Sequence, residues 1–209
     1  YFFPMFRTLN GVEVSNISKN FIKNWQNIMG TNISEIEIFN YIYALLHSEK
    51  FRKKYINSLL RDFPKIPIIS DKKIFLNLVN LGGKLKDLHL LKNSSLSIIS
   101  EYSISGTNMI KQVKYDEKEQ RIYVNQDQYF SNISLKIWDF KIGSYYLLKK
   151  WLDTKMNTCL TSHDIDMFQK IVNVINETKI LQKRIDSIFP TVLENVVKMD
   201  KSDQNLNAF

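Results

Sequence analysis

The helical part of this chain centres on residues 39–55, which read FNYIYALLHSEKFRKKY. The same region continues as FPKIPI at residues 63–68 and as LKDLHLL at residues 85–91. Apolar side chains recur at helical spacing in the first and last segments, and Ser48 can cap a second helix that runs toward Pro64. Proline fixes the backbone and lacks an N–H, so Pro64 and Pro67 predict a stiff connector. We expect two helices that meet at Ser48, this connector, and then a third helix.

Helix caps extend this pattern on both sides. Side chains that accept hydrogen bonds from a first helical turn precede four apolar-periodic segments: Asn16 or Ser18, Ser34 with Glu37 at capping-box spacing, Ser48, and Asp71. Gly30 ends the first of these helices, and the last reaches Leu91. Within that last helix, Gly82-Gly83 predicts a kink or a close approach by another backbone, and a tolerated break fits equally well.

Strand-like patterns replace the helical ones after residue 92. Residues 96–102 read as a strand, and residues 109–115 and 121–125 flank an acidic turn at 116–119, which predicts a hairpin. A further strand is expected at 133–140. Helical spacing returns from Gly143-Ser144 to about Asp153, and again from Thr161 or Ser162 until Pro190 breaks it. The predicted class is α+β, with helical N- and C-terminal flanks around a small, mostly antiparallel β region.

Three parts are expected along the chain. Residues 1–15 look extended, with a turn at Asn10-Gly11, and would be a linker from an upstream domain. Residues 16–196 would form one domain, and residues 197–209 a polar tail. The sequence begins with Tyr1, so we expect a piece of a longer polypeptide.

Composition bounds the kind of partner. The 209 residues carry a formal net charge of +8, which favours a polyanion such as nucleic acid, although a merely basic protein fits equally well. A hydrophobic fraction of 44% suffices for a sizeable core. Cys159 is the single cysteine, and we find neither a signal peptide nor an apolar run that spans a bilayer. We expect a cytoplasmic protein without a membrane partner.

Motifs that carry chemistry are missing from the sequence. There is no glycine-rich phosphate loop, since Leu81-Gly82-Gly83-Lys84 lacks the spacing of one. His47, His89 and His163 have no cysteine or carboxylate at a metal-ligand spacing. The expectation is a chain without catalytic residues, metal or cofactor of its own.

DNA binding has better candidates. Lysine can bond guanine edges, and Asn and Gln can bond adenine edges, while basic side chains elsewhere hold phosphates. Candidates for base readout lie in and beside the β region: Asn93, Lys111, Gln112, Lys114, Asn125 and Gln126. Candidates for backbone contacts are Arg52, Lys53, Lys54, Lys65, Lys92, Lys136 and Lys141. The alternative is that these residue types, which are common throughout the chain, are only solvated.

Several blocks together carry a family resemblance. They include YIYALLHS at 41–48, FPKIP at 63–67, IWDFKIGSY at 137–145 and KWL at 150–152. In this order they resemble the C-terminal specificity domain of type ISP restriction-modification enzymes, which are single-polypeptide DNA-translocating enzymes. The resemblance covers residues 35–188. Lys65 and Ser144 depart from it, because the family usually has Arg and Gly there.

The resemblance implies a non-catalytic target recognition domain that binds double-stranded DNA. It implies upstream methyltransferase and motor domains in the same polypeptide, which would carry adenine-N6 methylation and cleavage. S-adenosylmethionine, ATP and Mg²⁺ would belong to those domains. The alternative is a structural or docking module of the same enzyme with little direct base readout.

Overall fold

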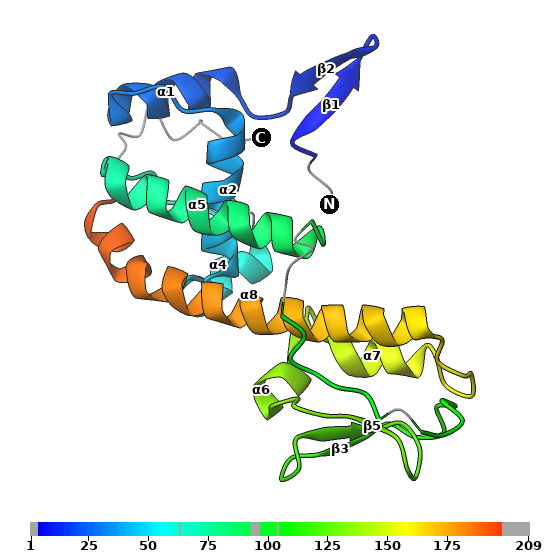
Figure 1. Cartoon of the computed structure of the whole chain (residues 1–209). Helices are drawn as coiled ribbons and strands as arrows, with labels where there is room; N and C mark the ends of the chain where they lie inside the picture. Colours follow the sequence, from blue (N-terminus) through cyan, green and yellow to red (C-terminus); the bar gives the residue numbers. More distant parts are fainter. Residues whose placement is uncertain (1–3, 63, 93–96, 104, 198–209) are drawn as a thin grey trace. The chain divides into compact units, whose positions relative to one another are not determined.

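The computed structural model describes residues 4–62, 64–92, 97–103 and 105–197 (Figure 1). The chain divides into two compact units, one that ends at Leu90 and resumes at Ile180, and one that spans Leu91–Lys179. Helices dominate the described residues, and the sheets are small and antiparallel, which confirms the predicted α+β class. In these ranges, no helix combines the length and the apolar character that crossing a bilayer requires.

The first unit begins with a hairpin of β1 (Phe6–Leu9) and β2 (Val12–Ser15). Asn10 and Gly11 connect the strands, with φ angles of 51° and 79°. Positive φ at both central residues is the geometry of a tight hairpin turn, and Asn-Gly is the pair that adopts it most easily. The turn predicted at Asn10-Gly11 is therefore confirmed.

The helices of this unit are α1 (Lys19–Met29), α2 (Glu35–His47), α3 (Glu49–Lys54), α4 (Ile56–Arg61) and α5 (Lys72–His89). Four predicted caps are present: Ser18, Ser34, Ser48 and Asp71 each accept a hydrogen bond from the first turn of a helix. Gly30 ends α1 in the left-handed conformation, with φ 61°. These boundaries follow from local chemistry, which is why the sequence predicts them.

The single helix predicted after Ser48 is wrong, because the structure breaks it at Tyr55 into α3 and α4. Tyr55 has φ −108° and ψ 19°, outside the helical range. Phe51 is the buried residue of α3, and α4 has none. A helix without a continuous buried face has little tertiary packing to keep it straight.

The core of the first unit lies where α2 crosses α5 (Figure 1). Trp25, Tyr41 and Phe75 are fully buried there, and the indole of Trp25 lies 5.1 Å from the ring centroid of Tyr41. Helix α5 continues through Gly82 and Gly83. A Cβ at Gly82 would overlap the backbone carbonyl oxygen of Asn40 on α2. The prediction of a close backbone approach is confirmed.

The second unit contains a three-stranded antiparallel sheet of β3 (Lys114–Asp116), β4 (Arg121–Tyr123) and β5 (Tyr129–Phe130), in that order. Lys114 pairs with Tyr123 and Asp116 with Arg121, which confirms the predicted hairpin. The strand predicted at 96–102 is only partly described, because residues 93–96 lie outside the described ranges. Its described end joins β5 through a bridge between Tyr102 and Phe130.

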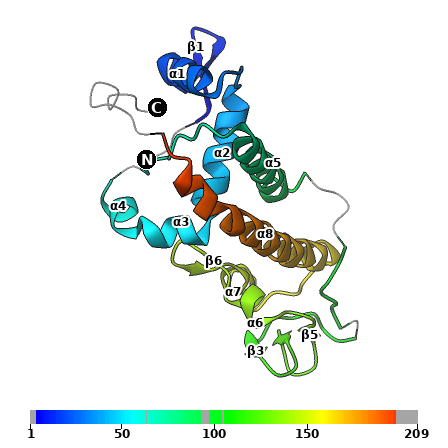
Figure 2. The same cartoon turned by 90° about the vertical axis from the view of Figure 1, so that its left-hand side faces the viewer.

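The remaining elements of this unit are α6 (Leu135–Trp138), β6 (Lys141–Ile142), β7 (Tyr145–Tyr146), α7 (Leu147–Asp153) and residues 162–179 of α8 (Ser162–Glu194). Figure 2 shows β3 and β5 at the end of the unit away from α7. The core unites the inner face of the sheet with these helices, through Ile122, Phe130, Leu148, Phe168 and Val172 among others.

Three expectations in the C-terminal half are wrong. The strand predicted at 133–140 contains the helix α6. The helix predicted from Gly143-Ser144 begins only at Leu147, since β6 and β7 form a hairpin around Gly143, whose φ is 59°. Helix α8 passes through Pro190 and ends at Glu194, with Phe189 and Val192 buried on either side of the proline. Their burial offsets the roughly 3 kcal/mol that an interior proline costs.

Candidate nucleic-acid interface

One face of the sheet in the second unit is turned away from the core. Ile122 and Phe130 are fully buried, and Val113 and Tyr115 pack against the same core. Because side chains alternate along a strand, their neighbours point to the opposite side. We call this opposite side the outer sheet face, and it consists of Gln112, Lys114, Arg121, Tyr123 and Tyr129.

The outer sheet face and the segments beside it carry several of the predicted base-reading residues. Lys114 is exposed and stands directly opposite Tyr123. Lys111 is exposed and lies three residues before Lys114. The backbone amides of Lys111 and Gln112 both donate to the carbonyl of Val124. Gln126 is exposed on the loop between β4 and β5. The structure thus brings Lys111, Lys114 and Gln126 to one part of the unit, whereas Asn93 lies outside the described residues.

Asn125 and Gln112 make hydrogen bonds within the protein. The Asn125 side chain accepts from the amides of Asp127 and Gln128 at 3.0 and 2.7 Å, and it donates to the carbonyl of Met109 at 3.2 Å. Nε2 of Gln112 donates to the carbonyl of Asn125 at 2.7 Å. These bonds close the turn that presents Gln126, so both side chains hold the loop in shape.

Gln128 links this loop to a second one. Its side chain is fully buried; Oε1 accepts from the Asn108 amide at 2.7 Å, and Nε2 donates to Oδ1 of Asn108 at 2.7 Å. Gly106, with φ 138°, packs against it so closely that a Cβ would lie 2.6 Å from Oε1. Loops 105–109 and 124–128 therefore share one buried amide, and a buried amide is costly unless it is bonded in this way.

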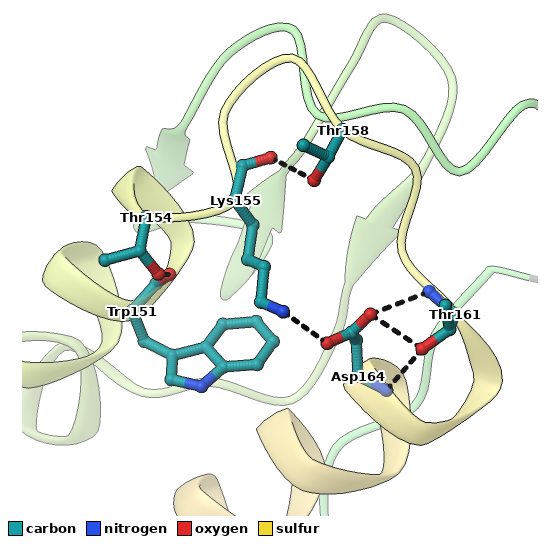
Figure 3. A network of polar contacts seen from close by, with 6 residues as sticks. All are labelled: Trp151, Thr154, Lys155, Thr158, Thr161 and Asp164. Atoms are coloured by element: carbon teal, nitrogen blue, oxygen red, sulfur yellow. Dashed lines mark hydrogen bonds and ion pairs between the residues drawn. The ribbon is translucent and has the colours of Figure 1, made fainter.

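A third segment fixes residues 108–110, which lead into Lys111. Residues 154–161, between α7 and α8, pair with 108–110: Ile110 donates to the carbonyl of Thr158 at 3.0 Å, and Leu160 donates to that of Asn108 at 2.8 Å. Asp164 anchors the segment (Figure 3), because its carboxylate accepts from Nζ of Lys155 at 2.7 Å and from Thr161 Oγ1 at 2.6 Å. These bonds hold the pKa of Asp164 well below its ordinary value, with the Lys155 contact as the largest cause.

Three residues of the outer sheet face were not predicted from the sequence, namely Arg121, Tyr123 and Tyr129. The Arg121 guanidinium lies over the Tyr129 ring, 4.3 Å from its centroid, and the rings of Tyr123 and Tyr129 are 5.4 Å apart. Arg121 also forms an ion pair with Glu119 at 3.3 Å. The alternation of Arg121 and Tyr123 about the apolar Ile122 is the signal that could have placed them on one face.

The candidates for phosphate contacts are spread over both units. Lys53, Lys54 and Lys65 are exposed in the first unit, while Arg52 is half-buried and donates to the carbonyl of Leu46 at 2.9 Å. In the second unit the exposed candidates are Lys92, Lys136 and Lys141. Lys141 lies on the β6–β7 hairpin, with Nζ 4.2 Å from the ring centroid of Tyr146.

The histidines of the first unit form an aromatic cluster with Tyr43. The Tyr43 hydroxyl lies 2.7 Å from Nδ1 of His89, and the rings of His47 and His89 are 5.0 Å apart. Burial first, and then the neighbouring charges of His89 and Arg52, lower the pKa of His47 to about 4. No group of three or more metal-ligating side chains occurs among the residues that the structure describes.

A small antiparallel sheet with a basic and aromatic outer face, set among helices, can present hydrogen-bond donors and stacking rings to a nucleic acid. Consistent with this, the family model for the type ISP C-terminal specificity domain matches residues 1–184. The chain therefore belongs to the type ISP C-terminal specificity domain family. A comparison with curated proteins gave no match.

Solved structures share the fold. A cryoEM structure of a DrdV–DNA complex superposes with a TM-score of 0.68 at 21% identity, over 88% of this chain and 21% of the other. The ATP-dependent type ISP restriction-modification enzyme LlaBIII bound to DNA gives 0.59 at 20% identity, over 92% and 14%. A nuclease-deletion mutant of the type ISP enzyme LlaGI with a DNA substrate mimic gives 0.57 at 21% identity, over 94% and 18%. The chain thus spans about a fifth or less of these chains.

Proposed function

We propose that this chain is the DNA target recognition domain of a restriction-modification enzyme, and that the outer sheet face with its two loops contacts the bases. The observation that carries the proposal is the exposure of Lys111, Lys114 and Gln126 on one part of a specificity domain. Lysine and glutamine supply donors and acceptors that match base edges in the major groove.

Within this proposal the predicted readout residues divide into two roles. Lys111, Lys114 and Gln126 contact bases. The side-chain amides of Asn125 and Gln112 form hydrogen bonds within the protein that hold the loop, so these two act as positioning residues. Asn93 stays a candidate for base readout.

The exposed lysines elsewhere hold phosphates and set affinity rather than sequence. This group comprises Lys53, Lys54, Lys65, Lys92, Lys136 and Lys141. Arg52 also belongs to this group, but its contribution to phosphate binding is smaller because its guanidinium already donates to the carbonyl of Leu46.

The chemistry would lie outside this chain. Adenine-N6 methylation and cleavage, with S-adenosylmethionine, ATP and Mg²⁺, are proposed for other parts of a longer polypeptide, namely a methyltransferase and a motor. The similar DrdV and LlaBIII structures are complexes with DNA, and this supports DNA as the partner here.

Point variants of the full polypeptide test the proposal. Lys114→Ala and Gln126→Ala are expected to change the methylated motif, because they remove base contacts. Lys53→Ala is the matched control: it is expected to keep the motif, weaken binding to all sequences alike and lower the salt dependence by about one phosphate contact. If both kinds of variant kept the motif and differed from wild type only in the salt dependence, direct base readout by this face would be rejected.

A docking module is the second candidate, and the β6–β7 hairpin favours it. Ile142 and Tyr145 are 58% and 62% exposed there. Clustered exposed apolar side chains are typical of interaction surfaces. In that case Ile142→Asp would undock this domain from the other domains of the polypeptide without altering the motif. A domain that stays docked but binds DNA more weakly would favour a DNA contact by the hairpin.

A further inference from the structure

Arg121 is the feature of the outer sheet face that the proposed function has not used. It is the only arginine between residues 91 and 179. Its guanidinium is stacked 4.3 Å from the centroid of the Tyr129 ring. The side chain is thus held by an aromatic surface on the strand next to its own.

Holding the Arg121 side chain in this arrangement lowers its conformational entropy and contributes little to the stability of the fold. The ion pair with Glu119 joins side chains that are 33% and 55% exposed, and ion pairs of that kind contribute little to folding. An orienting role accounts better for a cation that is stacked on one ring and paired with one carboxylate. An arginine that is already oriented loses less entropy when it binds a ligand.

The chemistry of the side chain selects the ligand. Stacking uses one face of the planar guanidinium, and the Glu119 carboxylate pairs with Nη1 at its edge. The other N–H donors can form a parallel pair of hydrogen bonds. Among base edges in the major groove, O6 and N7 of guanine are the acceptors that fit such a pair.

We propose that Arg121 is a specificity-determining residue that reads one guanine of the recognised duplex through its O6 and N7 atoms. This inference rests on the proposed function and narrows it: the proposed contact between the outer sheet face and the bases becomes a contact between one residue and one guanine. Tyr129 and Glu119 act as positioning residues, since they fix the plane and the rotation of the guanidinium.

Mapping of methylated adenines tests the base. The full polypeptide is expressed with Arg121→Lys, which keeps the charge and loses the planar pair of donors. Methylation is expected to spread to sites with another base in place of one guanine, with the rest of the motif unchanged. Arg184→Lys, an exposed arginine of the first unit, is the matched control and is expected to leave the motif as it is. A wild-type motif without guanine overturns the inference at once.

Duplexes with 7-deazaguanine test the contact itself. Each guanine of the motif is replaced in turn, which removes the N7 acceptor. Binding by the full polypeptide is expected to weaken about tenfold at one guanine, because a good pair of bonds discriminates by roughly that factor or more. In Arg121→Ala the same replacement is expected to have no further effect.

The outcomes separate the two claims. If the loss at every guanine is the same in wild type and Arg121→Ala, Arg121 does not read guanine, whatever else the variant does. If exchange of residues 92–142 for those of a relative still changes the motif, the proposed function survives that failure. Thermal unfolding of the Arg121 variants checks that they fold. If Arg121→Ala does not fold, the comparison of wild type with Arg121→Lys decides the case.

Discussion

Gly82 of α5 lies directly on the backbone of Asn40 in α2. A Cβ at Gly82 would overlap the Asn40 carbonyl oxygen and would lie 2.7 Å from its carbonyl carbon and 3.2 Å from the Ala44 amide nitrogen. Backbone atoms cannot turn away as the end of a side chain can. The two helices can cross at this distance only because residue 82 has no side chain.

Gly82→Ala is therefore expected to destabilise the first unit, even though alanine favours helices by about 1 kcal/mol. Overpacking at a helix crossing costs roughly 1–3 kcal/mol or more, so the net free energy of unfolding falls. Gly83→Ala is the matched control, because its Cβ meets the Asn40 side chain at 3.2 Å. Urea unfolding of both variants measures the difference; equal stability would show that the crossing is not tight.

The second prediction concerns the hydrogen bonds of the buried Gln128 side chain. Gln128→Glu removes the donor that bonds Oδ1 of Asn108, and it places a carboxylate oxygen against that acceptor at a buried position. The loss is expected to cost about 1–3 kcal/mol of stability and to weaken motif-specific methylation. Gln126→Ala serves as the control, since this exposed side chain is expected to affect the motif and leave urea unfolding unchanged. A stable Gln128→Glu variant with wild-type methylation would show that the network does not hold the loops.

His47 makes stability depend on pH. Its pKa is lowered from 6.5 to about 4 in the folded state, so between these values the unfolded chain binds more protons. The stability contribution is complete above pH 6.5 and is lost as the pH falls toward 4. In His47→Gln the decline of stability between pH 6.5 and 4 is expected to be shallower, and His163→Gln, at an exposed site, is expected to keep the wild-type decline. Identical curves for all three proteins would contradict the burial of a neutral His47.

Asp164 and Thr161 form a reciprocal cap at the start of α8, in which Thr161 Oγ1 accepts from the Asp164 amide and the Asp164 carboxylate accepts from the Thr161 amide, and this cap is sensitive to lower pH. The pKa of Asp164 is held below 3.8, so its contribution is present above that value and is lost as the pH falls below it. Asp164→Asn is expected to lower the free energy of unfolding at pH 7 by about 1 kcal/mol, the usual worth of a helix cap. Asp166→Asn, exposed on the same helix, is the control. Urea unfolding at pH 7 measures both, and a larger effect at Asp166 would contradict the role of the network in Figure 3.

The sequence predicts those features, such as helix caps and tight turns, that depend only on residues close together in the chain. Ser18, Ser34, Ser48 and Asp71 cap helices through bonds to residues three positions on, so their roles can be read locally. Asn10-Gly11 fixes its turn in the same way. The wrong strand at 133–140 shows the limit. Ile133 and Ile137 are buried, and Leu135 between them is exposed, so burial there follows helical and not alternate spacing.

The candidate site could be predicted only in outline. Lys111, Lys114 and Gln126 are polar residues that the hairpin brings to one region, and the hairpin is visible in the sequence. The internal bonds of Asn125 and Gln112 depend on where Met109 and the 124–128 loop meet, and the residue types do not reveal this. The stacking of Arg121 on Tyr129 joins β4 and β5, and β5 is too short to be recognised from its pattern.

The central claim is that residues 92–142 select the DNA sequence. The most direct test exchanges these residues in the full polypeptide for those of a relative with a different motif and maps the methylated adenines in the host. The account predicts that the chimera methylates the motif of the donor. Methylation of the original motif by a folded chimera would contradict it.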